Sequence, residues 1–215
     1  MGFTGARLPE TYGAPRCFIQ QRRRPDRAFR VACTNQKCCE NPVPDDYFGW
    51  LFLAQHYGLP TRLLDWSESP LIALYFAVTE GYEDHDGCIW ALWPGGLNSH
   101  YDASLDLVQI RDAKVKEIAE CAFVPGQTCD QVIIAIDGRE IDLRMLVQMG
   151  RFTLHAYGTP IENLTGSAKW SRRYIVPREV KLKIRNQLAA FGIRRSNLFP
   201  DLANLAANLR ERRFG

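Results

Sequence analysis

The segment AQHYGLPTRLLDWSESPLIALYFA, residues 54–77, is far denser in chemically versatile side chains than the sequence around it. A simple connector between two helices needs little more than a glycine and a proline. This connector also holds six side chains that can bind or react, namely His56, Tyr57, Thr61, Arg62, Asp65 and Trp66. Polar groups of this kind are costly to remove from water unless they find partners. The segment therefore predicts either a functional pocket or a braced turn.

These two interpretations differ in the partner of Arg62. In the functional one, Arg62 binds an anion such as a phosphate, while His56 and Tyr57 contact a ring or transfer a proton. In the structural one, Arg62 and Asp65 form a bidentate pair that braces a tight turn. The residue types suit both, so the sequence leaves both open.

Two apolar helices must position this segment. The first is predicted over 46–57, because Asp45 and Asp46 can accept hydrogen bonds from the free amides that open a helix and a glycine follows its end. The second is predicted over 69–80, with Ser69 as its N-cap. Its apolar residues cover nearly the whole circumference, which predicts a central, buried helix.

Later in the chain, short segments rich in β-branched and aromatic residues predict four strands, at 87–94, 131–137, 151–157 and 172–177. GGL at 95–97 is expected to form a turn between elements. An amphipathic helix is predicted over 178–191. Its apolar stripe consists of Val180, Ile184, Leu188 and Phe191. A last helix is expected to begin at Pro200.

The composition, 46% hydrophobic and 24% charged residues in a chain of 215, is that of an ordinary globular protein. Together with the predicted elements, it indicates a single compact α+β domain over 46–215, in which helices pack against a small mixed or antiparallel sheet. Residues 1–45 are rich in proline, and their apolar residues do not recur at the period of a helix or a strand, so we expect an irregular N-terminal segment.

Charge is unevenly distributed along the chain. Residues 1–30 carry seven arginines and two acidic residues, and residues 165–215 carry twelve basic and three acidic residues, whereas the part between them is acidic. A basic C-terminal segment can bind nucleic acid or an acidic protein, or it can simply attract the acidic body of the fold. The cations considered for a partner are Lys169, Arg172, Arg173, Arg194 and Arg195.

The sequence lacks the features of several classes of protein. No stretch of about 18 apolar residues predicts a transmembrane helix, so we expect no membrane partner and a cytoplasmic location. Seven cysteines is an odd number, which favours reduced thiols. Cys33, Cys38 and Cys39 lack the paired spacing of a zinc site, and no metal is predicted. Nucleotide-loop, serine-hydrolase and metalloprotease motifs are missing from the sequence.

The string QHYGLPTRLLDW, followed by SPLIALYFA, closely resembles the signature of the FRG domain family. CIWALWP is similar to the strand that follows in that family, RMLVQMGRFTLHAY to its later Gln-x-Gly-x-Phe motif, and VPREVKLKIRNQLAAFGIRRSNLFPDL to its closing helix and Phe-Pro-Asp segment. The resemblance runs from about residue 46 to residue 208. The Phe-Arg-Gly motif that names the family is not found, since Val31 follows Phe29 and Arg30.

This resemblance implies a bacterial or phage-associated accessory or toxin-like module. A weaker similarity to ADP-ribosyltransferases implies an NAD site, in which residues 61–77 supply a hydroxyl-bearing strand beside a helix. Gln148 then stands where those enzymes carry a late acidic residue, and an amide can orient a ribose hydroxyl but cannot act as a carboxylate.

The sequence therefore predicts two alternative functions. In the first, NAD or another nucleotide is bound by Tyr57, Thr61, Arg62, Asp65 and Trp66, and His56 and Gln148 serve catalysis. In the second, the chain is a non-catalytic module that binds nucleic acid or protein through its basic C-terminal residues. An inactive fragment that lacks the first element of the family is a further alternative.

Overall fold

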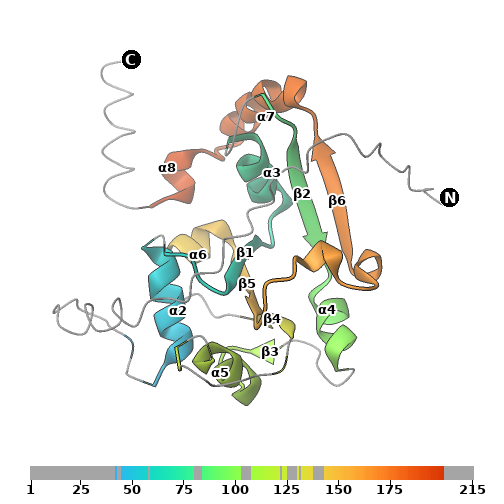
Figure 1. Cartoon of the computed structure of the whole chain (residues 1–215). Helices are drawn as coiled ribbons and strands as arrows, with labels where there is room; N and C mark the ends of the chain where they lie inside the picture. Colours follow the sequence, from blue (N-terminus) through green and yellow to red (C-terminus); the bar gives the residue numbers. More distant parts are fainter. Residues whose placement is uncertain are drawn as a thin grey trace.

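Helices pack against two β-sheets in the α+β arrangement that the sequence predicts (Figure 1). The computed structural model describes residues 42, 45–57, 59–79, 84–102, 108–121, 123–124, 130, 132–137 and 143–200. The predictions for residues 1–41, for the helix beyond Pro200 and for the three clustered cysteines lie outside the described residues. In the part that is described, no helix is long and apolar enough to cross a membrane.

A four-stranded mixed sheet forms the first half of the molecule, with strand order β1-β5-β4-β3. The β1–β5 and β5–β4 pairs are antiparallel, and β4 and β3 are parallel. The strands are β1 (Leu63–Ser67), β3 (Val108–Gln109), β4 (Ile133–Asp137) and β5 (Gly150–His155). Both faces of the sheet are covered, so the buried residues of β4 and β5 are consecutive, and their side chains point alternately to the two faces.

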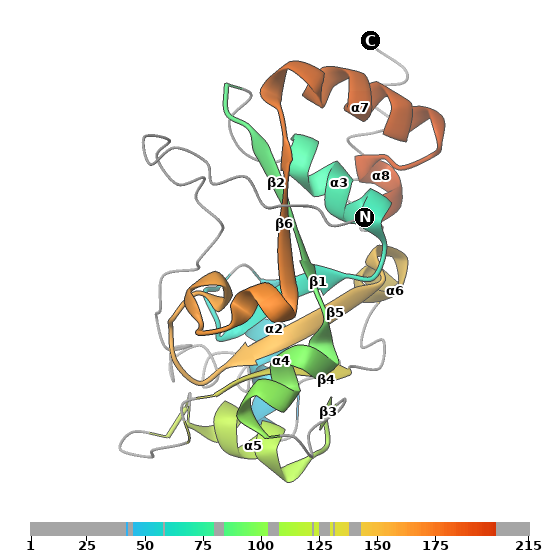
Figure 2. The same ribbon diagram turned by 90° about the vertical axis from the view of Figure 1, so that its right-hand side faces the viewer.

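On one face, Leu63, Ile134 and Phe152 pack with α2 (Tyr47–His56) and α5 (Ala113–Glu120) in the largest core cluster. On the other face, Ile133 and Ala135 pack with α4 (Pro94–Tyr101) and with Trp170. The sheet is thus the middle of three layers: Figure 1 shows α2 and α4 on opposite sides of its strands, and in Figure 2 α4 lies in front of the strands and α2 behind them.

A second sheet has only two strands, β2 (Gly87–Leu92) and β6 (Ser171–Val176), which pair antiparallel as a long ribbon. Helices α3 (Pro70–Thr79) and α7 (Arg178–Ala190) pack against each other at one end of it (Figures 1 and 2). The short elements are α6 (Leu143–Gln148), α8 (Arg195–Leu198) and two 3-10 turns, η1 (Ile161–Asn163) and η2 (Ser167–Lys169).

Both helix starts predicted from capping residues are confirmed. The Asp46 carboxylate accepts a hydrogen bond from the Gly49 amide at 2.8 Å and opens α2. The Ser69 hydroxyl accepts from the Ile72 amide at 3.4 Å and opens α3. Side-chain caps of this kind typically stabilise a helix by about 1 kcal/mol.

Several expectations about the elements were wrong. The strands form two sheets instead of one, because β2 and β6 pair only with each other. GGL at 95–97 lies inside α4, where Pro94 occupies the first turn and starts the helix. The connector after α2 contains a strand, β1, which pairs with a segment more than 80 residues away.

The burial of two helices also differs from the prediction. In α3, Ile72, Tyr75 and Val78 are buried and most of the other side chains are partly buried, so the helix packs in the second core cluster without being buried all round. In α7, Leu188 is buried as expected, but Phe191 is 80% exposed. Leu188 and Ile184 of α7 pack in a cluster with residues of α3, β6 and α8, whereas Phe191 follows the last residue of the helix and lies outside that cluster.

Met149 adopts a left-handed backbone conformation, with φ 49°, directly after α6. Its amide donates to the Leu146 carbonyl, and its carbonyl accepts from the Glu68 amide at 3.0 Å, which fix this conformation. Glycine adopts it without the Cβ clash that costs other residues roughly 1–2 kcal/mol. We therefore expect Met149→Gly to raise the free energy of unfolding by about 1 kcal/mol in urea denaturation. Met149→Ala retains the strain and serves as the control, and equal stability of the two variants would contradict the explanation.

Candidate functional site

The chemically dense segment is divided between the two faces of the four-stranded sheet. Residues 63–67 form β1, and side chains of a strand alternate between faces. Asp65 lies opposite Phe152, on the face of α2, whereas Trp66 lies opposite Arg151, on the face of α4. The predicted ligand-binding residues therefore belong to two separate groups.

On the α2 face, Gln55 connects Thr61 and Asp65. Its amide nitrogen donates to the Asp65 carboxylate at 2.7 Å, and its amide oxygen accepts from the Thr61 hydroxyl. The Thr61 hydroxyl also accepts from the Leu63 amide at 3.1 Å. Desolvation raises the pKa of the Asp65 carboxyl, and the hydrogen bond from Gln55 and the charge of Arg144 oppose that rise. This group fastens the end of α2 to the start of β1.

On the α4 face, Trp66 begins a line of three polar side chains. Its indole nitrogen bonds the Thr153 hydroxyl at 3.1 Å, which in turn lies 2.9 Å from the ring nitrogen Nε2 of His155. Arg62 donates from Nη1 to the Ala156 carbonyl at 3.1 Å and accepts from the His155 amide through its own carbonyl at 2.9 Å. These contacts continue the β1–β5 pairing beyond the strand end.

The expected Arg62–Asp65 pair does not form. Arg62 lies just before β1 and bonds β5, while Asp65 bonds α2 from the opposite face. The connector is therefore braced by side-chain hydrogen bonds, as the structural interpretation predicts, but Arg62 and Asp65 bond other residues and not each other. A spacing of three brings two side chains together on a helix, whereas in a strand it places them on opposite faces.

The remaining predicted residues lie away from both groups. Tyr57 follows α2 and is 64% exposed, and the ring of His56 stacks edge-on against it at 5.3 Å. Gln148 donates from its side-chain amide to the Leu198 carbonyl at 2.9 Å and so ties α6 to α8. The roles assigned to His56 and Gln148 in catalysis stay predictions.

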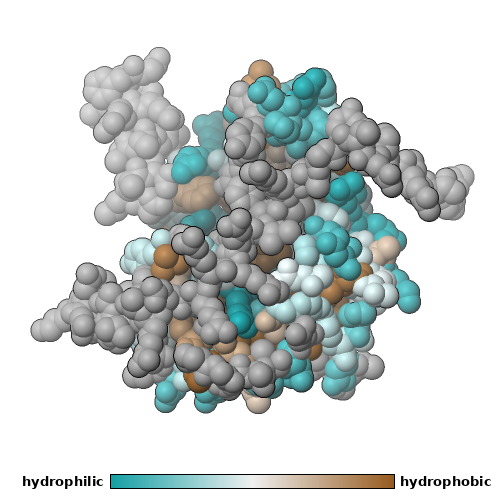
Figure 3. All heavy atoms as spheres, in the orientation of Figure 1, coloured by the Kyte–Doolittle hydropathy of each residue, from teal (hydrophilic) through white to brown (hydrophobic). Residues whose placement is uncertain are grey.

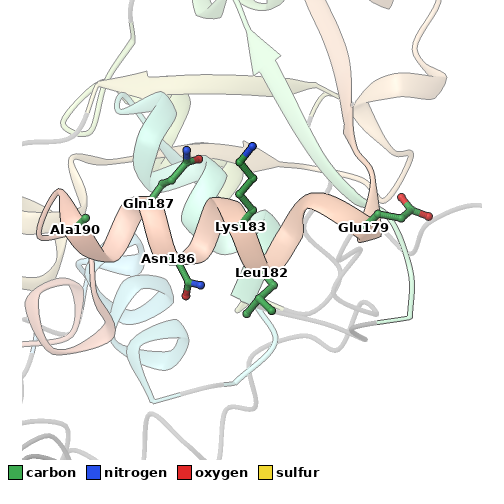
Figure 4. Close-up of a pocket in the computed structure, with 6 residues that line it drawn as sticks. All are labelled: Glu179, Leu182, Lys183, Asn186, Gln187 and Ala190. Atoms are coloured by element: carbon green, nitrogen blue, oxygen red, sulfur yellow. The ribbon is translucent and has the colours of Figure 1, made fainter.

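A shallow hollow lies on α7, far from these residues in sequence (Figure 4). It is lined only by side chains of that helix, Glu179, Leu182, Lys183, Asn186, Gln187 and Ala190. Figure 4 shows these side chains diverging from one ribbon. A binding cavity needs walls from several elements, so this hollow gives no enclosed site for a small molecule.

The β2–β6 ribbon is the more unusual surface. Four successive residues of β6, from Arg172 to Ile175, are exposed, although strand residues usually alternate between buried and exposed. We define the ribbon surface as the exposed cations and aromatic rings on and beside β2 and β6, namely Lys169, Arg172, Arg173, Tyr174 and Trp93, together with the partly buried Trp90. Hydrophilic residues cover much of the side of the molecule where β6 lies (Figure 3).

The three cations of the ribbon surface form no ion pair with the residues that the structure describes. Arg173 lies over the Trp90 ring, 5.9 Å from its centroid. Arg172 donates to the backbone carbonyls of Ala168 and Ser171. Within the described part of the chain, no carboxylate therefore neutralises the positive charge of this surface.

The other two cations of the predicted basic group lie elsewhere. Arg194 donates to the Ala189 carbonyl at the end of α7, and Arg195 lies 5.0 Å from the Phe199 ring centroid. Figures 1 and 2 both show α8 at a distance from the start of β6. Sequence reasoning grouped these residues by their place in the basic C-terminal segment and missed Trp90 and Trp93, whose proximity to the cations depends on strand pairing.

A protein-family model matches the part of the chain that contains α2, β1 and α3. Residues 10–86 match the family model of the FRG domain. The resemblance seen in the signature string is thereby confirmed. No curated protein and no solved structure matches the chain.

The FRG match begins at residue 10, inside the segment expected to be irregular, and ends just before β2. It covers both helices and the strand that carry the signature string. Within it, Gln55, Thr61 and Asp65 join α2 to β1, and Arg62 joins the start of β1 to the end of β5, which gives the signature a structural role. The ribbon surface lies outside the match, and the domain limits of 1–45 and 46–215 stay a prediction.

Proposed function

We propose that this protein is a non-catalytic nucleic-acid-binding module that uses the ribbon surface. One observation carries the proposal: three cations without acidic partners among the described residues lie on or beside β6, which also exposes Tyr174, and the exposed ring of Trp93 follows the paired strand β2. Such a combination is typical of surfaces that contact phosphates and bases together. A protein partner would instead favour a larger apolar centre.

The nucleotide-binding alternative has less support. An NAD site would need its ligand-binding residues around one cavity, but β1 separates Asp65 from Arg62 and Trp66. Their polar atoms also bond neighbouring elements of the fold. ADP-ribosyltransferase activity and an NAD cofactor accordingly remain untested predictions from resemblance.

Nucleic-acid binding is tested by fluorescence anisotropy with labelled oligonucleotides at several salt concentrations. Lys169→Glu with Arg173→Glu should weaken binding at least about tenfold, and loss of two phosphate contacts should reduce the salt slope by roughly 1.4. The matched control is Lys116→Glu with Lys183→Glu, which changes the net charge equally on α5 and α7. Equal losses in both variants would mean that only overall charge matters, and the ribbon surface would then not be the binding site.

Arg62→Ala separates a structural from a ligand-binding role of this arginine. We expect the variant to melt below the parent, because it loses the hydrogen bond to Ala156 and the packing of the side-chain stem. Millimolar NAD should leave the melting temperature of both proteins unchanged. A stabilisation of the parent by NAD that Arg62→Ala abolishes would favour the nucleotide site over the present proposal.

A further inference from the structure

One face of the ribbon carries two exposed aromatic rings in addition to Arg172. Because successive strand residues point to opposite faces, the register places Ala91, Arg172 and Tyr174 on the same face. Trp93 continues the extended backbone beyond β2, with φ −92° and ψ 104°, so it projects on the side of Ala91. Trp93 is 66% exposed and Tyr174 is 57% exposed. Ala91 between them is small and leaves this stretch of the face open.

The two rings are spaced along the ribbon. The Trp93 amide donates to the Trp170 carbonyl at 2.7 Å, which places Trp93 beside Trp170. Tyr174 is four residues further along β6, a distance of about 13 Å at about 3.3 Å per strand residue. Stacked nucleotides rise about 3.4 Å each, so the rings span about four nucleotides of a stacked strand and fewer of an extended one. Arg172 lies between the rings and can contact a phosphate there.

Resting on the proposed function, we infer that the ribbon surface binds single-stranded nucleic acid, with unpaired bases stacked on Trp93 and Tyr174. An exposed ring can stack only on a base whose own face is free. In a duplex both faces of each base are covered by its neighbours, except at the ends, whereas an unpaired strand offers them along its length. Stacking of this kind tolerates any base, so the preference is for strandedness and not for sequence.

Trp93 is held in place by its surroundings, as a stacking platform must be. A Cβ built on Gly96 would lie 2.6 Å from the Trp93 ring, so glycine is what allows the ring to pack on the first turn of α4. One face of the indole is thereby fixed against the helix, while most of the residue stays in contact with solvent. A rigid ring loses little conformational entropy when a base stacks on it.

The experiment compares the full chain with four variants on oligo(dT), on oligo(U) of equal length and on a blunt DNA duplex of the same length. Trp93→Leu keeps an apolar contact with Gly96 but removes the aromatic surface. Tyr174→Ala removes the second ring, and Tyr174→Phe retains it. Lys183→Glu serves as a surface control on α7. Anisotropy gives the affinity, and a melting curve of each variant identifies any that fails to fold.

We expect the parent to bind both single strands more tightly than the duplex. Trp93→Leu and Tyr174→Ala should each weaken single-strand binding by about five- to a hundredfold, while Tyr174→Phe binds like the parent. Duplex binding as tight as single-strand binding, with all aromatic variants equal to the parent, would overturn the inference and leave the proposed function standing. Failure of the parent to bind any of the three probes would overturn both. A difference between oligo(dT) and oligo(U) would identify which nucleic acid is preferred.

Discussion

Replacing Asn98 by alanine is expected to lower the free energy of unfolding by about 3 kcal/mol, because two buried backbone groups lose their partners. The Asn98 side chain is fully buried beside β4. Its amide nitrogen donates to the Ala135 carbonyl at 3.0 Å, and its oxygen accepts from the Ala135 amide at 2.7 Å. Asn98 thus pairs with β4 as a neighbouring strand would. Urea denaturation of the purified chain measures the loss.

Asn186→Ala is the matched control, since Asn186 lies on the exposed face of α7 and should change stability by less than about 0.5 kcal/mol. Asn98→Asp adds a pH test. The aspartate still accepts a hydrogen bond from the Ala135 amide, but its carboxyl is buried, and burial raises its pKa in the folded state. The variant should therefore be less stable than the parent at neutral pH, and this loss in the free energy of unfolding should become smaller as the pH falls below the raised pKa. A deficit of Asn98→Ala no larger than that of Asn186→Ala would show that the pairing with β4 contributes little.

Gly87→Ala is expected to cost about 2–3 kcal/mol, because the added methyl group meets backbone and not a movable side chain. A Cβ on Gly87 would lie 2.3 Å from the carbonyl oxygen of Ala77 and 3.2 Å from its carbon. Gly87 begins β2 at the point where this strand crosses α3, so relief of the clash must separate the helix from the ribbon. The midpoint of thermal unfolding should fall accordingly.

Gly150→Ala controls for the chemistry of the substitution. Gly150 begins β5, and a Cβ there would lie 3.5 Å from Met145, an ordinary van der Waals contact. Its stability should stay close to that of the parent or rise slightly, because alanine restricts the unfolded chain. If both glycine variants melted alike, the close approach of α3 to β2 would not be what requires glycine at position 87.

The sequence alone determined those features whose causes are local. The first residues of α2 and α3 were predicted correctly because Asp46 and Ser69 bond amides three residues away. Strands β2, β4, β5 and β6 were located to within about two residues, since their composition favours extended backbone whatever they pair with. The signature string around residue 60 likewise identified the FRG resemblance, which the match over residues 10–86 confirms.

Features that depend on distant partners were missed. Leu63–Ser67 carries the residues of a polar connector, and it becomes a strand only because β5 supplies its hydrogen-bonding partners. Phe191 was expected to be buried because it continues the apolar stripe of the predicted helix over 178–191. It is exposed, since the distant elements that pack on this helix do not reach it.

Only the tertiary structure decided which side chains lie together. Strand alternation separated Asp65 from Arg62 and Trp66, so residues adjacent in sequence did not form the expected single site. The pairing of β2 with β6 placed Trp90 beside Arg173, more than 80 residues away in sequence. Charge and residue type can be read from the sequence, but the composition of a surface depends on sheet register, which long-range packing sets.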